Sequence, residues 1–170
     1  MGGELHCTQK EDRMRRPERE IKNRETIDAL LERTLVGRIA TINRKRFPVI
    51  KPVNFLYWDG KIYFHSSKKG EKMADIRRGS RICFEVDEPI AYVLAKGSAC
   101  SSSYFYRSII VKGNGHLVNQ REKKLTILKR LMEKYQPEGG YDEFPEAMVQ
   151  KTAVVEISIQ EMTAKQHLGS

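Results

Sequence analysis

Alternation of apolar and polar residues dominates the middle of the chain. This period of two is typical of β-strands, in which neighbouring side chains point to opposite faces of a sheet. In the clearest case Ile82, Phe84 and Val86 share one face, and the Asp59-Gly60 pair marks a hairpin turn between two such segments. The pattern predicts six strands, over residues 37–42, 48–58, 61–66, 81–86, 104–118 and 153–162.

Helical spacing of apolar residues marks a smaller part of the chain. Residues 25–33 form a short amphipathic segment that Asn23 can cap, and residues 71–78 form another that Gly79 can end. A longer helix is predicted over residues 122–135, with a further helical turn over 143–149. Gly113 and Gly115 lie within the long predicted strand over residues 104–118 and predict a bend or bulge in it.

Many short strands with hairpin turns and few helices favour a mainly β fold with flanking helices, of the α+β class. We expect an antiparallel barrel with the helices packed outside it. Strands and helices do not alternate regularly enough for a doubly wound sheet. A glycine-rich dinucleotide motif and a Walker loop are both missing from the sequence, so a bound nucleotide would have to be held in another way.

The length of 170 residues suits one domain, which we place at residues 14–170 behind a disordered, highly charged tail at 1–13. The sequence has no apolar run long enough to span a membrane and no hydrophobic signal core at its start, which predicts a cytoplasmic protein. Three cysteines without a Cys-x-x-Cys pair agree with a reducing compartment. The net charge of +9 calls for a partner or an anionic ligand.

The most informative local pattern covers residues 62–72, where a strand runs into a loop rich in hydroxyls and lysines. Alternation places Ser66 on the face of Ile62, and His65 on the opposite face. A phosphate here could accept hydrogen bonds from the serine hydroxyls and from backbone N–H groups, with Lys72 as the compensating charge. An exposed turn with solvated lysines explains the same pattern equally well.

An ordered series of motifs resembles the flavin-binding split barrels related to pyridoxamine-phosphate oxidase, and within them the Nim-type nitroimidazole-resistance proteins. The resemblance covers residues 14–162. It rests on the opening of residues 14–21, on Gly37-Arg38-Ile39-Ala40-Thr41, Pro52-Val53-Asn54-Phe55, Ile62-Tyr63-Phe64-His65-Ser66, Gly70-x-Lys72, and Tyr106-Arg107-Ser108 with Gly113.

This resemblance implies a homodimer of six-stranded antiparallel split β-barrels with one flavin mononucleotide (FMN) in each of two sites at the subunit interface. It places His65, Ser66 and Lys72 along the ribityl-phosphate end of the flavin, and implies a catalytic role for His65. The remaining implied cofactor-binding residues are Pro52, Val53 and Asn54 beside the ring, Arg38 and Thr41 near the phosphate or the ring rim, and Arg107 and Ser108 from the other subunit.

By the same resemblance we expect a flavin-dependent oxidoreductase that takes electrons from NAD(P)H and reduces 5-nitroimidazole-type compounds; the sequence leaves FAD open in place of FMN. Pyridoxamine-phosphate oxidation is disfavoured, because the C-terminal part lacks a second basic set for a phosphorylated vitamin. The alternative is a binding protein that carries flavin or haem without turnover. Nucleic acid is a weaker partner, because aromatic residues are not interleaved with the basic clusters. Histidines and cysteines do not occur at metal-ligand spacing, so no metal is predicted.

Overall fold

The structure is a computed structural model and describes residues 14–169. The predicted disordered tail at 1–13 lies outside these residues. In chain order the elements are η1 (Pro17–Arg19), α1 (Arg24–Arg33), β1 (Gly37–Ile42), β2 (Pro48–Val53), β3 (Phe55–Trp58), β4 (Lys61–Ser67), α2 (Glu71–Arg77), β5 (Arg81–Val93), η2 (Ala99–Ser101), β6 (Ser103–Leu117), α3 (Arg121–Tyr135), α4 (Glu146–Lys151) and β7 (Thr152–His167).

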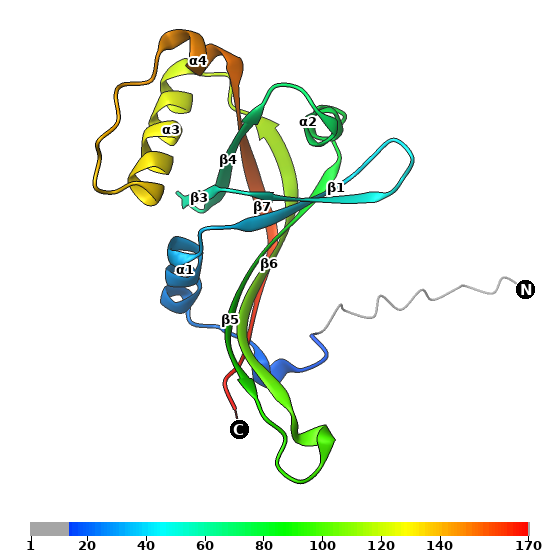
Figure 1. Ribbon diagram of the computed structural model, residues 1–170. Coiled ribbons are helices and arrows are strands. Elements are labelled where there is room, and N and C mark those ends of the chain that lie inside the picture. Colours follow the sequence, from blue (N-terminus) through cyan, green and yellow to red (C-terminus); the bar gives the residue numbers. More distant parts are fainter. Residues whose placement is uncertain (1–13, 170) are drawn as a thin grey trace, which may run out of the picture.

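The strands form one antiparallel sheet in the order β2-β1-β5-β6-β7-β4-β3. This order places β2 at one edge of the sheet and β3 at the other. Only Asn54 separates these two strands in the sequence, so the two edges must meet at this residue. The sheet therefore curls into a barrel that stays open beside the junction, which confirms the predicted split barrel (Figure 1).

The predicted single strand over residues 48–58 is thus divided in two. Its first half pairs with β1 up to the Val53–Gly37 pair, and its second half pairs with β4 from Phe55–Phe64 onwards. Counted as one strand, the two halves give the six strands expected from the sequence. The division at Asn54 leaves the apolar alternation intact, which is why the pattern did not reveal it.

Two apolar clusters flank the sheet. The inner cluster fills the barrel and includes the fully buried Phe55, Phe64 and Phe84, together with residues of α1 and α2. In Figure 1 α1 lies below the β1–β3 segment and α2 lies above it. The outer cluster joins α3 and α4 to β3, β4 and β7 through Tyr63 and Leu128. The face opposite this pair of helices remains open, with Ile50 exposed on it.

Local chemistry sets several of the element boundaries. The Asn23 side chain accepts the N–H of Thr26 at 2.8 Å and starts α1, which confirms the predicted cap. Gly79 ends α2 with a φ of 81°, in the left-handed region that favours glycine. The predicted bulge also occurs, because the β6–β7 register shifts between Lys112 and Gly113. At Gly113 a Cβ would lie 2.2 Å from the carbonyl oxygen of Ser158, so only glycine fits.

Strands β5, β6 and β7 form a long arm below the barrel (Figure 1), and β5 and β7 run well beyond their predicted segments, whereas the predicted length of β6 is confirmed. The prediction ended β5 at residue 86 and β7 at residue 162, whereas the strands reach Val93 and His167. The arm residues of β5 are mostly exposed on both faces, so they carry no apolar alternation. Pairing with neighbouring strands, rather than burial, defines these ends.

Two further expectations concern the compartment. Of the predicted reduced cysteines, Cys83 and Cys100 are free and exposed, while Cys7 lies outside the described residues. Among residues 14–169 we find no helix with the length and apolar character needed to cross a membrane.

The junction between β2 and β3 is held by the hydroxyl of Tyr135, at the end of α3. This oxygen accepts the N–H of Phe55 at 2.8 Å, and its proton is shared between the carbonyl oxygens of Leu35 at 2.7 Å and Phe55 at 3.0 Å. We expect Tyr135→Phe to lower the free energy of unfolding by about 1–3 kcal/mol, because it leaves partly buried backbone groups without a partner. Urea denaturation measures this loss.

The matched control is Tyr141→Phe, which removes the same atom from a side chain that is exposed. Its unfolding free energy should stay within about 0.5 kcal/mol of the parent. Equal losses in the two variants would contradict the role given to Tyr135.

Candidate functional site

The strongest candidate site lies where β2 and β4 part. The β3–β4 ladder ends at the Phe55–Phe64 pair, and the next residues on the two strands are Asn54 and His65. Beyond this point β2 pairs with β1 on one side only, while β4 pairs with β7 as far as Ser67. We call residues 51–54 of β2 and 65–67 of β4 the seam. Each strand turns an edge without a ladder partner toward it, so backbone groups can reach a ligand there.

Alternation along β4 positions the seam side chains as predicted. Phe64 belongs to the inner cluster and Tyr63 to the outer one, so His65 continues the outer face and Ser66 the inner face. His65 is exposed, and Ser66 is half-buried at the mouth of the barrel. The strand therefore aims the imidazole and the hydroxyl to the two sides of the seam.

A short, fixed loop brings Lys72 to the seam. The Ser67 hydroxyl accepts the N–H of Lys69 at 3.3 Å, and the guanidinium of Arg77 donates to the carbonyl oxygen of Lys68 at 2.7 Å. Gly70 follows with a φ of 110° and allows the chain to turn into α2. At the start of that helix the Lys72 ammonium lies over the ring of the buried Phe64, 4.9 Å from its centre.

The seam gathers three basic groups: Lys51 and Lys72 repel each other, and Lys72 disfavours protonation of His65. Partial burial, and then the charge of Lys51, lower the pKa of Lys72. The pKa of His65 is also lowered, first because the surrounding protein partly desolvates the ring and then because of the charge of Lys72. Within residues 14–169 none of the three is in an ion pair. An anion bound among them would relieve this repulsion, so the electrostatics fit a phosphate.

Three other predicted residues line the β2 side of the seam. Pro52 is exposed and has no N–H to donate, Val53 is buried in the inner cluster, and Asn54 is exposed at the junction itself. The Asn54 amide also reaches the hydroxyl of Tyr135. Burial raises the pKa of this phenol, and hydrogen bonds from Phe55 and Asn54 oppose the rise.

Arg38 and Thr41 have other partners. The Arg38 guanidinium donates to the carboxylates of Glu85, at 3.1 Å, and Asp87 on the neighbouring strand β5. Thr41 is buried, and its hydroxyl donates to the buried carboxylate of Asp75 at 2.9 Å, which ties β1 to α2. In this chain both side chains serve contacts within the fold.

Arg107 and Ser108 lie on the arm, far from the seam of the same chain. Phe64 pairs with Val155 and Val155 pairs with Leu117, so Leu117 marks the level of the seam on β6. Arg107 stands ten residues further along this strand, or about 33 Å at the rise of an extended chain. It donates to Glu88 at 3.1 Å instead. Only a second chain could bring this segment to a seam.

The sequence analysis missed two contributors, Lys51 and Tyr135. Lys51 pairs with the buried Ile39 and so shares the inward side of β2 with Val49 and Val53. A lysine on an otherwise apolar alternating face is the signal that could have identified it. Tyr135 ends the predicted helix over residues 122–135, and its hydroxyl partners depend on tertiary packing that no local pattern contains.

Comparison with known proteins places the chain among proteins of this architecture. Residues 23–166 match the family described as Pyridoxamine 5'-phosphate oxidase. No curated protein matches the chain in sequence.

Several solved structures share the fold at low sequence identity. The FAD and haem binding protein from Mycobacterium smegmatis has a TM-score of 0.81 at 20% identity, over 89% of this chain and 74% of that one. A flavocytochrome from Azotobacter vinelandii has a TM-score of 0.82 at 21% identity, over 92% and 73%. A candidate 5-nitroimidazole antibiotic resistance protein from Bacteroides thetaiotaomicron has a TM-score of 0.73 at 20% identity, over 86% of each chain.

The repulsion within the seam gives a testable prediction. Lys72→Met removes the charge that lowers the pKa of His65, so this pKa should rise toward its ordinary value. NMR titration of the imidazole measures the shift, with the resonance assigned by its loss in His65→Gln. Lys69→Met removes an exposed neighbouring charge and should leave the pKa of His65 close to that of the parent. An unchanged or lower pKa in Lys72→Met would refute the proximity of the two groups.

Proposed function

Because the chain belongs to the pyridoxamine 5'-phosphate oxidase family, we propose that it is a flavin-dependent oxidoreductase that binds FMN at the seam. The observation that carries this proposal is the pair of like charges, Lys51 and Lys72, that lies with the neutral His65 beside two free strand edges. A phosphate group supplies the negative charge that these groups lack, and its oxygens can accept from Ser66 and from the backbone.

The residues of the seam fit the other parts of the flavin as well. The edge of β2 at residues 51–54 offers backbone groups to the polar rim of the ring, and Asn54 offers an amide that can donate and accept. Pro52 has no N–H, so the backbone offers no hydrogen-bond donor to one position on the rim of the flavin ring. When bound, the flavin would supply the transfer of hydride or electrons, which no side chain of the seam can carry out.

We assign His65 the role of donor to the electron acceptor. Its lowered pKa keeps the imidazole neutral at pH 7, so one ring nitrogen carries a proton that it can donate as a hydrogen bond. A nitro group gains negative charge during reduction, and a fixed donor stabilises that charge most when water is excluded. This makes a 5-nitroimidazole-type compound a suitable acceptor, with NAD(P)H as the electron donor. The neighbour from Bacteroides, described as a nitroimidazole resistance protein, supports this choice.

We further propose that the active form is a homodimer. Arg107 and Ser108 lie about 33 Å from the seam along β6, so they could serve a flavin only from the partner subunit. The open face of the sheet offers the exposed side chains of Ile42, Ile50 and Ile110 to such a partner. Apolar side chains grouped on one face favour association.

A cofactor carrier without turnover is the second candidate function. The neighbour from Mycobacterium smegmatis is described as binding FAD and haem, and that from Azotobacter vinelandii as a flavocytochrome. A protein of this kind would bind the group at the same seam but would not pass electrons from NAD(P)H to a nitro compound.

Titration with FMN and with riboflavin tests the site. Lys72→Met should weaken FMN binding at least about tenfold, because it removes a charged partner of the phosphate. Riboflavin lacks the phosphate, so its affinity should be the same for Lys72→Met and the parent. Lys129→Met, on the exposed face of α3, is the charge-matched control and should bind both ligands as the parent does. Equal loss of FMN and riboflavin, or binding of haem alone, would reject the FMN site.

Anaerobic oxidation of NAD(P)H by the FMN-loaded protein tests the reaction. A 5-nitroimidazole should accelerate it, and His65→Gln should lower the turnover at least about tenfold while FMN remains bound. Retained flavin without acceleration would favour the carrier function.

The dimer has its own test in light scattering with size separation. Ile50→Lys places a charge on the open face, where Ile50 is 63% exposed, and should convert a dimer to a monomer with little loss of stability. A parent protein that is monomeric at all concentrations would refute the dimer.

A further inference from the structure

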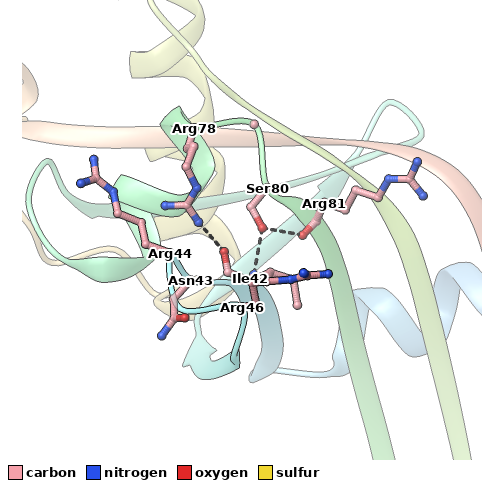
Figure 2. A pocket seen from close by; sticks show the side chains of 8 residues that line it. Ile42, Asn43, Arg44, Arg46, Arg78, Ser80 and Arg81 are labelled. Atoms are coloured by element: carbon pink, nitrogen blue, oxygen red, sulfur yellow. Dashed lines mark hydrogen bonds between the residues drawn. The ribbon is translucent and has the colours of Figure 1, made fainter.

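A second basic site lies apart from the seam, between the β1–β2 hairpin and the turn from α2 to β5. A cavity of about 710 Å³ opens here, and four arginines line it: Arg44, Arg46, Arg78 and Arg81. In Figure 2 Arg46 and Arg78 lie near the middle of the view, with Arg44 and Arg81 on either side. The cavity is within the size range of pockets that hold small molecules.

The floor of this cavity is rigid. Arg78 donates to the carboxylate of the buried Asp75 at 3.0 Å and to the carbonyl oxygen of Ile42. The Ser80 hydroxyl accepts the N–H of Ile42 at 2.9 Å and so joins the turn to β1. These contacts fix the position of the Arg78 guanidinium before any ligand arrives, which lowers the entropy lost on binding.

The hairpin that carries the other wall is also held in place. The Asn43 side chain accepts the N–H groups of Lys45 and Phe47 at 2.9 and 3.0 Å. Arg46 has a φ of 65°, and its N–H donates to the carbonyl oxygen of Asn43 at 2.9 Å. The turn is therefore defined by its own hydrogen bonds, and the arginine side chains project from a fixed backbone.

Charge is the distinctive property of the cavity. Asp75 balances Arg78, whereas Arg44, Arg46 and Arg81 form no ion pair within residues 14–169. These three arginines line one concavity, with Arg44 and Arg81 extending to opposite sides of it in Figure 2, and their charges suit a ligand with several negative charges. Because each guanidinium can donate two parallel hydrogen bonds, phosphate oxygens match it better than a single carboxylate does.

We propose that this cavity is a second anion site, which binds the diphosphate group of a small phosphorylated molecule such as a nucleoside diphosphate. Phosphate chemistry is shared with nucleic acids, but those follow an extended basic stripe with aromatic residues between the cations. Here the basic groups surround a cavity.

The site is separate from the seam. Arg46 lies in the turn before β2, whereas Lys51 lies within that strand and faces the inside of the barrel. Asn43 of the hairpin donates to Glu71 at 3.1 Å, and Glu71 directly precedes Lys72. A carboxylate thus lies where the hairpin meets the start of α2.

Calorimetric titration with inorganic pyrophosphate, at constant ionic strength, tests the proposal on the full chain. Arg44→Gln with Arg81→Gln should weaken pyrophosphate binding at least about tenfold, since two charged donors are lost. Lys129→Gln with Lys151→Gln removes the same charge from exposed positions on α3 and α4 and should change the affinity less than about twofold. Equal effects of the two double variants would overturn the site. The single variant Arg44→Gln, at the hairpin tip, replaces the double variant if the latter fails to fold.

Two further titrations distinguish the kinds of phosphate ligand and distinguish this site from the seam. Protein saturated with FMN should bind pyrophosphate as tightly as free protein; competition would assign the arginines to the flavin site and reject a second one. Adenosine diphosphate should bind at least as tightly as pyrophosphate. A single-stranded oligonucleotide that binds more tightly, with a steep dependence on salt, would instead identify a nucleic-acid surface and overturn the proposal.

Discussion

The exchange of ladder partners at Asn54 is the constraint on which the rest of this structure depends. One extended segment gives its first half to β1 and its second half to β4, so it joins the two edges of the sheet while leaving the seam open. Had the β3–β4 ladder continued past Phe55–Phe64, β2 would cover the edge of β4, and His65 and Ser66 would face a paired strand. Tyr135 satisfies the backbone groups that the exchange leaves at the junction. The outer helix α3 therefore stabilises the opening of the barrel as well as its surface.

Charged side chains are compensated within the fold on one side of the protein but not on the other. On the side covered by α3, Glu156 receives hydrogen bonds from Lys123, Lys61 and Tyr63; burial alone would raise its pKa, but these bonds lower it to about 2. Those lysines are thus compensated within the fold, and their contribution to stability is lost only as the pH falls below the ordinary range of a carboxyl group. At the seam, in contrast, Lys51 and Lys72 are like charges, and His65 stays neutral beside them. A bound anion compensates these charges, so its binding stabilises the folded protein.

Much of the fold follows from local pattern, and the reasons for the failures are physical. The cap at Asn23, the stop at Gly79 and the bulge at Gly113 were predictable, because each depends on the backbone preferences of one residue. The extensions of β5 and β7 into the arm were not, since these ends are defined by pairing, and that of β5 carries exposed residues on both faces. The same distinction holds at the site: alternation alone oriented His65 and Ser66. Thr41 is tied instead to Asp75, 34 residues away, a contact that no local pattern encodes.

The seam and the arginine cavity also differ in the shape of ligand that their geometry suits. At the seam the charges stand beside free backbone edges, so a ligand with an anionic end and a long body with polar edges matches the whole surface. At the arginine cavity the backbone is already satisfied, by Asn43 on one wall and Ser80 on the other, and only side chains remain to bind. A compact anion is enough there. The two sites share no residue, so the side chains of one stay available when the other holds a ligand.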